Sequence, residues 1–201
     1  MEKPYNIVVL GSSRVGKTTL ITNKRDAVVS TIGVDFFCRE IQYENKKENI
    51  QFWDTSGQEI YNSICRNYYN KADCALLVFD LSNKDSWERA EKWFYDLREY
   101  DSDIGIVFIG NKADLVTELT QKQTADWVVM WGRAKELSET QNIKLLPCSA
   151  YNGDGVEECI IEAVKASRLK RKSKSVIERE RTVSLNQPLL NKEKIKTACC
   201  N

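Results

Sequence analysis

The sequence predicts an α/β fold with a mostly parallel, doubly wound sheet, and three observations lead to this prediction. Short runs with apolar centres alternate along the chain with stretches whose apolar residues recur at helical spacing. Two β-rich stretches stand on either side of four polar residues, as the strands of a hairpin do. A glycine-rich loop of the form G-x-x-x-x-G-K-[ST] follows the first apolar run, where a strand would pass into a helix.

Each strand and helix is predicted by its own residue pattern. Runs with apolar centres are typical of buried parallel strands, and they occupy residues 7–10, 75–81, 106–109 and 144–147. Hairpin strands are expected over residues 34–43 and 49–53, with the connection at 44–47. Apolar residues three or four apart predict helices over residues 86–100, 125–137 and 156–169, and a further helix is expected to begin at Lys17.

Charge divides the chain into a body and a tail. The 201 residues carry 30 basic and 29 acidic side chains, but ten basic and only three acidic ones lie from Ser167 onward, which leaves residues 1–166 with a net charge of −6. The tail also lacks aromatic residues, so it cannot bury enough apolar surface to offset its ordering entropy. We therefore expect one domain over residues 1–166 and a disordered basic tail over 167–201. An acidic body argues against a nucleic-acid partner, whereas a basic tail suits an anionic membrane.

Composition excludes several classes of protein. The chain contains no histidine, which removes Ser-His and Cys-His catalysis and histidine-ligated metal sites. No apolar run approaches the ~18 residues of a membrane-spanning helix, and the first residues lack a signal-peptide pattern, so we expect a cytoplasmic protein. The seven cysteines show no C-x-x-C spacing, which argues against a thiolate zinc site.

The glycine-rich loop, residues 11–18, predicts a phosphate-binding site. Successive N–H groups of such a loop turn toward phosphate oxygens, its lysine reaches the outer phosphates, and the hydroxyl that follows ligates Mg²⁺. The candidate nucleotide-binding residues here are Ser13, Arg14, Val15, Gly16, Lys17, Thr18 and Thr19. The loop alone does not distinguish an ATPase, a kinase and a GTPase.

The segment at residues 54–58, which follows the second hairpin strand, predicts the hydrolytic part of the site. Asp54 is placed to hold the metal through its water shell, and the Gly57 N–H is placed to meet the γ-phosphate. Gln58 is the candidate catalytic residue, because it is placed to orient an attacking water.

Two further motifs predict guanine recognition. A carboxylate at Asp114 accepts from two donors that guanine presents and adenine does not, and a backbone N–H after the last strand can read the guanine carbonyl. Each of the four motifs follows a strand, at the edge where an open α/β sheet binds its ligand. The residues of these two motifs are Asn111, Lys112, Asp114, Ser149, Ala150 and Tyr151.

These motifs, together with three further segments, resemble those of Rab-type small GTPases of the Ras superfamily. The further segments are residues 32–36, 53–59 and 68–72. The chain ends Cys199-Cys200-Asn201, which is similar to a Rab double-prenylation signal and unlike a C-a-a-X box. The resemblance covers residues 5–166 and the last three.

The resemblance implies a P-loop GTPase fold, with a six-stranded, mostly parallel sheet, one antiparallel strand and helices on both faces. It implies a monomeric switch that binds GTP and GDP and hydrolyses GTP slowly when unaided, with Mg²⁺ held by Thr18, Thr31 and Asp54. An exchange factor, a GTPase-activating protein and effectors would bind the switch regions. The prenylation machinery and a dissociation inhibitor would act on Cys199 and Cys200, and the lipid anchor would hold the protein on the cytoplasmic face of an intracellular membrane, in vesicle traffic.

One departure from the family pattern leaves alternatives open. Only eleven residues separate Thr19 from Thr31, several fewer than is usual. A first helix of three turns would leave too few residues to return Thr31 to the metal. Either that helix therefore ends near Asn23, or switch I, the segment that contains Thr31, does not close in the usual way. The alternative function is a nucleotide-bound membrane interaction module with negligible turnover, while the guanine motif argues against a P-loop kinase. The short segment also lacks an aromatic residue to cover the guanine, which predicts fast nucleotide release.

Overall fold

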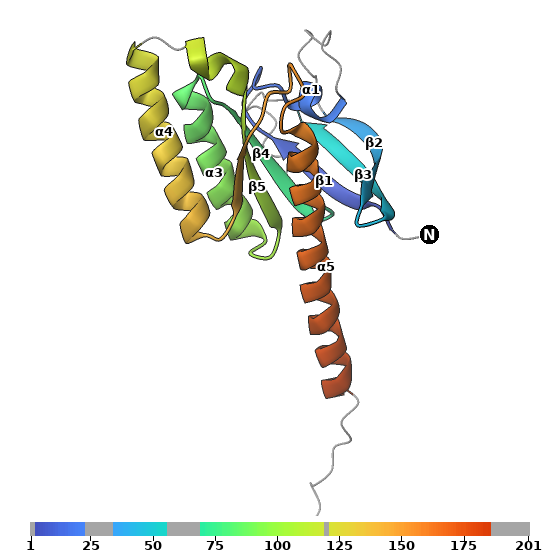
Figure 1. The fold of residues 1–201 in the computed structure, drawn as a ribbon. Helices are drawn as coiled ribbons and strands as arrows, with labels where there is room; N and C mark the ends of the chain where they lie inside the picture. The colour runs from blue at the N-terminus through green and yellow to red at the C-terminus, as the bar shows by residue number, and fades with distance from the viewer. Residues whose placement is uncertain (1–2, 23–33, 56–68, 119–120, 186–201) are drawn as a thin grey trace, which may run out of the picture.

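The computed structural model describes residues 3–22, 34–55, 69–118 and 121–185. Its strands and helices alternate as the sequence predicts (Figure 1). In chain order they are β1 (Tyr5–Leu10), α1 (Lys17–Thr22), β2 (Val34–Tyr43), β3 (Lys46–Thr55), β4 (Cys74–Asp80), α3 (Lys84–Tyr100), β5 (Gly105–Asn111), the 3-10 helix η2 (Ala113–Glu118), α4 (Gln121–Thr140), β6 (Lys144–Pro147) and α5 (Val156–Leu185).

The strands form one six-stranded sheet in the order β2-β3-β1-β4-β5-β6. Only β2 and β3 pair antiparallel, and every other neighbouring pair is parallel. Helices α1 and α5 cover one face of the sheet, and α3 and α4 cover the other (Figure 1). The predicted fold class, an α/β P-loop fold with one antiparallel strand, is therefore confirmed.

Buried side chains of the central strands alternate between two apolar layers, because successive side chains of a strand point to opposite faces. In β4, Leu76 and Val78 pack in the layer under α1 and α5. Leu77 and Phe79 pack in the layer under α3 and α4, where Trp87 is fully buried. Both layers fix the strand ends in space, and those ends carry the predicted site.

The hairpin turn is shorter than the sequence predicted. Glu44 and Asn45 have φ values of 50° and 60°, and β3 begins at Lys46 rather than at residue 49. Two central residues with positive φ are characteristic of a type I′ turn, whose twist matches that of the strands it joins. Lys46 and Lys47 therefore pair with Tyr43 and Gln42 and belong to the ladder.

Helix α5 is longer than predicted, and the expectation that a disordered tail begins at Ser167 is wrong for residues 167–185. The helix runs to Leu185 without an interrupting glycine or proline. Arg168 forms an ion pair with the buried Glu48, Lys170 with Asp101 at 2.6 Å, and Arg171 with Asp73 at 2.5 Å. These basic residues thus fix the helix to the body, whereas the sequence had suggested that they face a membrane.

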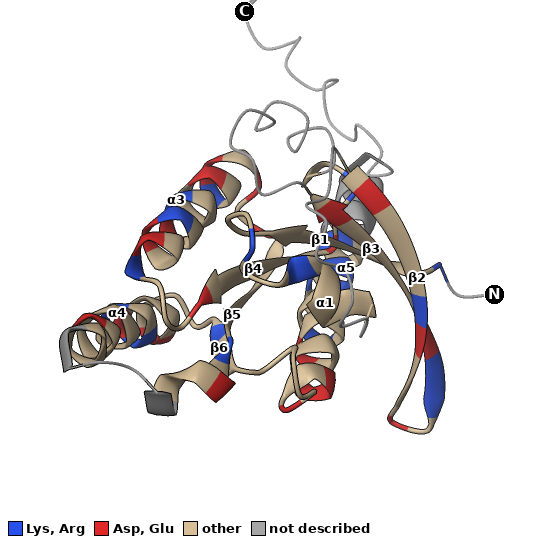
Figure 2. Cartoon of the chain, turned by 90° about the horizontal axis from the view of Figure 1, so that it is seen from above, with Lys and Arg blue, Asp and Glu red and all other residues tan. Residues whose placement is uncertain are grey.

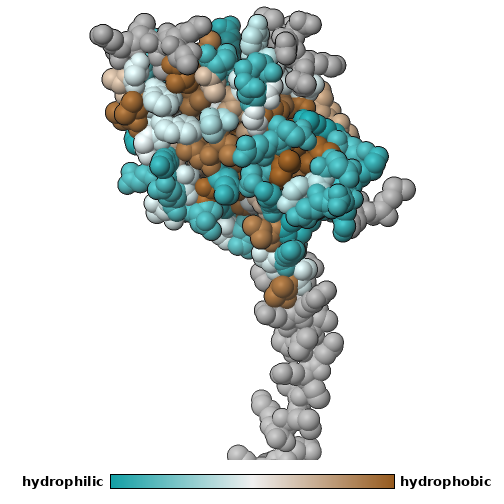
Figure 3. Space-filling model, viewed as in Figure 1, coloured by the Kyte–Doolittle hydropathy of each residue, from teal (hydrophilic) through white to brown (hydrophobic). Residues whose placement is uncertain are grey.

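Hydrophilic and a few hydrophobic residues are mixed on the surface around the point where α5 leaves the body (Figure 3), and the apolar Leu169 and Val176 of α5 are exposed. Burial lowers the pKa of Arg168, but its hydrogen bonds to Glu48 and Glu44 outweigh that effect and raise the pKa. The raised pKa keeps the guanidinium group of Arg168 protonated.

Within the described part of the chain, no helix combines the length and the apolar composition that crossing a bilayer requires.

Candidate functional site

The predicted motifs meet at one edge of the sheet, where the parallel strands β1, β3, β5 and β6 have their carboxyl ends (Figure 2 looks onto this edge). Strand β1 leads into the glycine-rich loop and α1, and β3 ends at Thr55. Strand β5 ends at Asn111, and β6 is followed by Ser149. Loops at this edge of an open sheet lie outside the ladder and can contact a ligand together.

The glycine-rich loop is folded tightly against its neighbours. Gly16 has a φ of 95°, and a Cβ atom at this position would lie 2.3 Å from the side-chain amide nitrogen of Asn111. A Cβ atom at Gly11 would lie 2.2 Å from the carbonyl oxygen of Val78. Both glycines of the motif are therefore required by close approach, and Gly16 is required also by its left-handed backbone.

The ammonium group of Lys17 lies over this loop. The side chain is buried, and its Nζ donates to the carbonyl oxygens of Gly11 at 2.8 Å and Ser12 at 3.0 Å. These contacts hold a positive charge above the loop, where phosphate oxygens would be placed.

Arg14 takes an unexpected backbone conformation. Its φ is 64°, in the left-handed region, although it is not a glycine, and its side chain is exposed. Such a conformation costs an ordinary residue ~1–2 kcal/mol. Ser13 is exposed beside it, whereas Val15 is buried in the layer under α5.

Thr18 and Asp54 place two oxygen ligands side by side. Asp54 is fully buried at the end of β3, and the Thr18 hydroxyl donates to its Oδ2 at 2.5 Å. Hydroxyl and carboxylate oxygens are the donors that Mg²⁺ prefers, with phosphate and water completing the shell. This pair fits a magnesium ion beside the phosphate loop, and Thr19 follows on α1, partly buried.

Asn111 connects three of the predicted loops. Its amide nitrogen donates to the Val15 carbonyl at 2.7 Å, and its amide oxygen accepts from the Ala150 N–H at 2.8 Å. The thiol of Cys148 also donates to this oxygen, at 3.5 Å. Asn111 is 2% exposed, so these bonds are shielded from water and fix the loops relative to one another.

The other residues of the two guanine motifs lie in different environments. Lys112, with a φ of 64°, forms an ion pair with Asp80 at 2.7 Å. Asp114 accepts a hydrogen bond from the Ser149 hydroxyl, which links the loops after β5 and β6. Tyr151 is 68% exposed, so its ring lies at the open rim of the site.

Asp80 is a site residue that the sequence analysis missed. It ends β4, its Oδ2 pairs with Lys112, and its Oδ1 accepts from the hydroxyl and the N–H of Ser82. The available signal was a carboxylate near the carboxyl end of the apolar run at residues 75–81. Its role is to hold Lys112 in place.

Five predicted functional residues lie outside the described part of the chain. They are Thr31, Gly57, Gln58, Cys199 and Cys200. The structure therefore leaves open the predicted choice between an early end of the first helix and an altered switch I, because that choice depends on residues 23–33.

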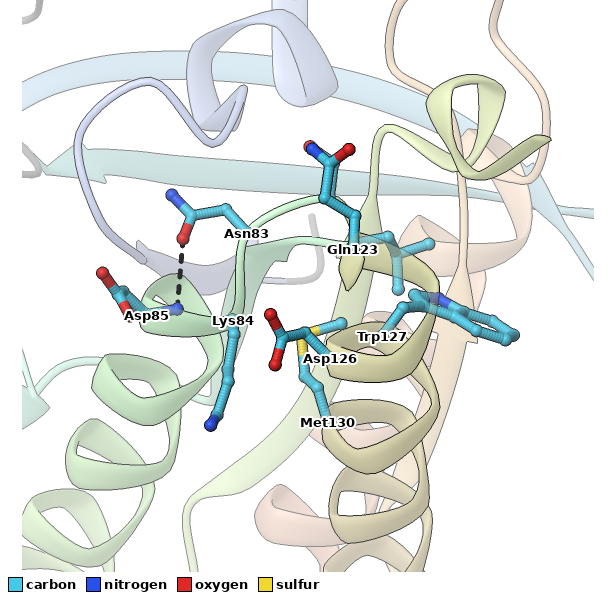
Figure 4. Close-up of a pocket in the computed structure, with 9 residues that line it drawn as sticks. Asn83, Lys84, Asp85, Gln123, Asp126, Trp127 and Met130 are labelled. Carbon is cyan, nitrogen blue, oxygen red and sulfur yellow. Dashed lines mark hydrogen bonds between the residues drawn. The ribbon is translucent and has the colours of Figure 1, made fainter. Parts of the chain in front are cut away.

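A cavity of about 380 Å³ lies close to this edge, between the starts of α3 and α4 (Figure 4). Asn83 caps α3 there by accepting from the Asp85 N–H at 3.1 Å. Lys84 and Asp126 also line it. None of the predicted nucleotide-binding residues contributes to its walls, so it is separate from the loops described above.

The chain is similar to known proteins of one family. A model of the family described as "Ras family" matches residues 6–169. Ras-related protein Rab-2B of Dictyostelium discoideum is 38% identical over 163 residues, covering 78% of this chain and 77% of that protein. Ras-related protein Rab-11A of the same organism is 39% identical over 159 residues, with 76% and 71% covered. GTP-binding protein YPTM2 of Zea mays is 30% identical over 206 residues, with 98% and 96% covered.

Proposed function

Because the chain belongs to the Ras family, as a Rab-type small GTPase that hydrolyses GTP to GDP, we propose that the loops after β1, β3, β5 and β6 form its nucleotide site. The observation that carries this proposal is the Asn111 side chain, whose bonds to Val15 and Ala150 join the phosphate loop to the guanine loops. A single rigid frame around both ends of a nucleotide is what tight binding requires.

At the phosphate end, Lys17 would neutralise the outer phosphates once its contacts with Gly11 and Ser12 are exchanged for phosphate oxygens. Thr18 and Asp54 would hold Mg²⁺, which supplies charge stabilisation for phosphoryl transfer. Gln58 would orient the attacking water. Hydrolysis would be slow when unaided, because no arginine of the described residues is positioned at the phosphate loop apart from the exposed Arg14.

At the base end, Asp114 would select guanine. Its carboxylate is held by Ser149, and it would accept from the two donors of the base. Loss of one buried charge-assisted bond costs a few kcal/mol. Asp114→Asn should therefore weaken GTP binding and shift preference toward xanthosine triphosphate, which has a carbonyl where guanine has its amine.

A matched control for that experiment is Asp96→Asn, which removes an exposed carboxylate from α3. Equilibrium titration of both variants with GTP and xanthosine triphosphate gives the comparison. Unchanged GTP affinity in Asp114→Asn would remove Asp114 from the site, while loss in both variants would indicate a general charge effect.

We also propose that the switch is anchored to an intracellular membrane through lipidated Cys199 and Cys200 and acts in vesicle traffic. Two lipid chains anchor a protein stably to a membrane, whereas one chain gives only reversible membrane binding. The helical residues 172–185 would carry the chain about 20 Å from the body at ~1.5 Å per residue, in place of the flexible tether that the sequence suggested. Exchange factors, activating proteins and effectors would then reach the switch regions from the cytoplasm.

Cell fractionation of a Cys199→Ser, Cys200→Ser double variant tests the anchor. We expect the double variant in the soluble fraction. The control is Cys38→Ser, which changes an exposed cysteine of β2 and should remain in the membrane fraction with the parent. Equal sedimentation of the double variant and the parent would reject lipidation as the anchor.

The alternative of negligible turnover rests on the short segment between Thr19 and Thr31. Single-turnover phosphate release from GTP-loaded protein, with and without Gln58→Leu, distinguishes it. Release that is slow in the parent and slower in the variant supports the hydrolytic switch, and release that the variant does not change favours the module.

A further inference from the structure

The outer part of α5 carries an exposed serine within a basic segment. Ser173 directly follows the basic residues 170–172, and Lys174 follows it. Its side chain is exposed, and the only partner of its hydroxyl among the described residues is the Leu169 carbonyl of the same helix, at 3.0 Å. The hydroxyl oxygen is therefore accessible from solvent.

Two other serines of this helix show what distinguishes Ser173. Ser167 also lies next to basic residues, but it is fully buried and donates to the Ala163 carbonyl at 2.8 Å. Ser175 is exposed, but the residue two positions before it is a serine. Of these three, Ser173 alone combines an exposed side chain with basic residues at all three preceding positions.

Two of the preceding basic residues hold α5 against the body. The ammonium group of Lys170 donates to Asp101 at 2.6 Å and to the Ala72 carbonyl at 2.9 Å, and the side chain is only 13% exposed. The guanidinium group of Arg171 donates two bonds to Asp73, at 2.5 and 3.0 Å. Both charges are thus already paired while α5 is docked.

Among the described side chains of α5, Arg171 makes the last bond to the body. Lys172, Lys174 and Ser175 are exposed, and their side chains have no hydrogen-bond or ion-pair partner outside the helix among the described residues. The helix then extends away from the sheet (Figure 1). Ser173 therefore lies just beyond the point of attachment, where another enzyme can reach it.

Basic residues before an exposed serine form the charge pattern that many protein kinases recognise, because acidic groups of the kinase pair with the basic side chains of the substrate. Lys170 and Arg171 cannot pair with a kinase while they pair with Asp101 and Asp73. Full recognition of Ser173 therefore requires that the outer part of α5 leaves its place on the body.

We propose that Ser173 is phosphorylated by a serine kinase that recognises basic residues, and that the docking of α5 controls this reaction. The Ser173 oxygen forms a bond to the γ-phosphorus of ATP, the bond between that phosphorus and the bridging oxygen of the departing ADP breaks, and the hydroxyl proton passes to the base of the kinase. The docked helix is a poor substrate, and the undocked helix is a good one. The proposal depends neither on the nucleotide site nor on the lipid anchor proposed above.

The test of the site uses the full chain without lipid modification, loaded with GDP. The probe is the catalytic subunit of cyclic-AMP-dependent protein kinase, which recognises basic residues two and three positions before a serine. Transfer of labelled phosphate from ATP gives the initial rate, and mass spectrometry of the digested protein locates the phosphate. Ser173→Ala should abolish phosphorylation of α5, whereas the matched control Ser175→Ala should retain it.

The test of the docking uses the double substitution Asp73→Asn, Asp101→Asn, which frees both basic side chains and leaves the sequence around Ser173 unchanged. We expect phosphorylation at Ser173 to be about tenfold faster or more, because each lost charge-assisted bond is worth at least that factor in the equilibrium between docked and undocked helix. The control is Asp96→Asn, Glu99→Gln, which removes the same charge from exposed sites on α3 and should react at the parent rate.

Circular dichroism and retained GDP verify that each variant is folded, and the single variant Asp101→Asn tests the same point if the double variant is not. The site is overturned if the phosphate lies elsewhere in the parent and in the Asp73, Asp101 variant, or if Ser173→Ala is phosphorylated as fast as the parent. Control by docking is overturned if the Asp73, Asp101 variant reacts at the parent rate, or if both double variants react equally faster.

Discussion

Replacing Asn111 with alanine tests whether one side chain holds the nucleotide loops together. The substitution removes the donor from the Val15 carbonyl and the acceptor from the Ala150 N–H, both in buried bonds. A buried main-chain group left without its partner costs ~1–3 kcal/mol, so the loss for two is ~2–6 kcal/mol. Even the lower value corresponds to about a 30-fold change in an equilibrium constant.

This loss should be expressed mainly as faster nucleotide release, because the bonds close the loops around the ligand. Release of a fluorescent GDP analogue, measured by stopped flow at fixed Mg²⁺ concentration, gives the rate. Asn49→Ala, which changes an exposed asparagine of β3, is the control and should release nucleotide at the parent rate. A release rate in Asn111→Ala within twofold of the parent would refute the role assigned to this residue.

Three further predictions concern stability. Arg171→Ala should lower the free energy of unfolding in urea by about 1.5–3 kcal/mol, because it removes charge-assisted bonds to Asp73, whereas the exposed Lys172→Ala should change it little; equal effects would contradict the docking of α5. Arg14→Gly should raise that free energy by about 0.5–1 kcal/mol, since it relieves left-handed strain at some entropic cost, and a destabilised variant would show that Arg14 makes compensating contacts. Burial acts to raise the pKa of Asp101, but the hydrogen bond from Lys170 holds it below the ordinary value of 3.8. Its stabilising contribution is therefore present above about pH 4 and lost as the pH falls through the folded-state pKa, so Asp101→Asn should flatten acid unfolding curves below pH 4, and curves parallel to the parent's would argue against this.

Strands could be predicted where burial alone determines them. The apolar run of β4 stands out because a parallel strand covered on both faces is largely apolar. The pattern at residues 34–43 matches the full extent of β2. The hairpin turn was placed less well, because Lys46 and Lys47 are polar and exposed although they belong to β3.

The long α5 could not be predicted because its partners are distant in sequence. Arg168 pairs with Glu48, which is 120 residues away, and Arg171 pairs with Asp73, which is 98 residues away. By composition, the second half of α5 is only a basic, weakly apolar segment, and such a composition usually indicates disorder. The same limitation hid Asp80, whose importance depends on the position of Lys112 in three dimensions.

Motifs could predict which residues gather at the site but not how they are held. The order of the four motifs placed Lys17, Asp54, Asn111 and Ser149 at one edge of the sheet, because parallel strands share the direction of their carboxyl ends. That Asn111 bridges the phosphate loop and the loop after β6 depends on atomic distances between strands. Such distances have no signature in a single sequence.

Identification of the nucleotide bound to the purified protein tests the central claim most directly. The protein, isolated in the presence of Mg²⁺ and denatured, should release guanine nucleotide at up to one molecule per chain, because the buried hydrogen bonds of Asn111 hold the phosphate loop and the guanine loops together around the ligand. Separation by anion-exchange chromatography distinguishes GDP and GTP from adenine nucleotides. A folded protein, judged by circular dichroism, that releases adenine nucleotide or none, and that does not take up GDP when it is added, would contradict the account.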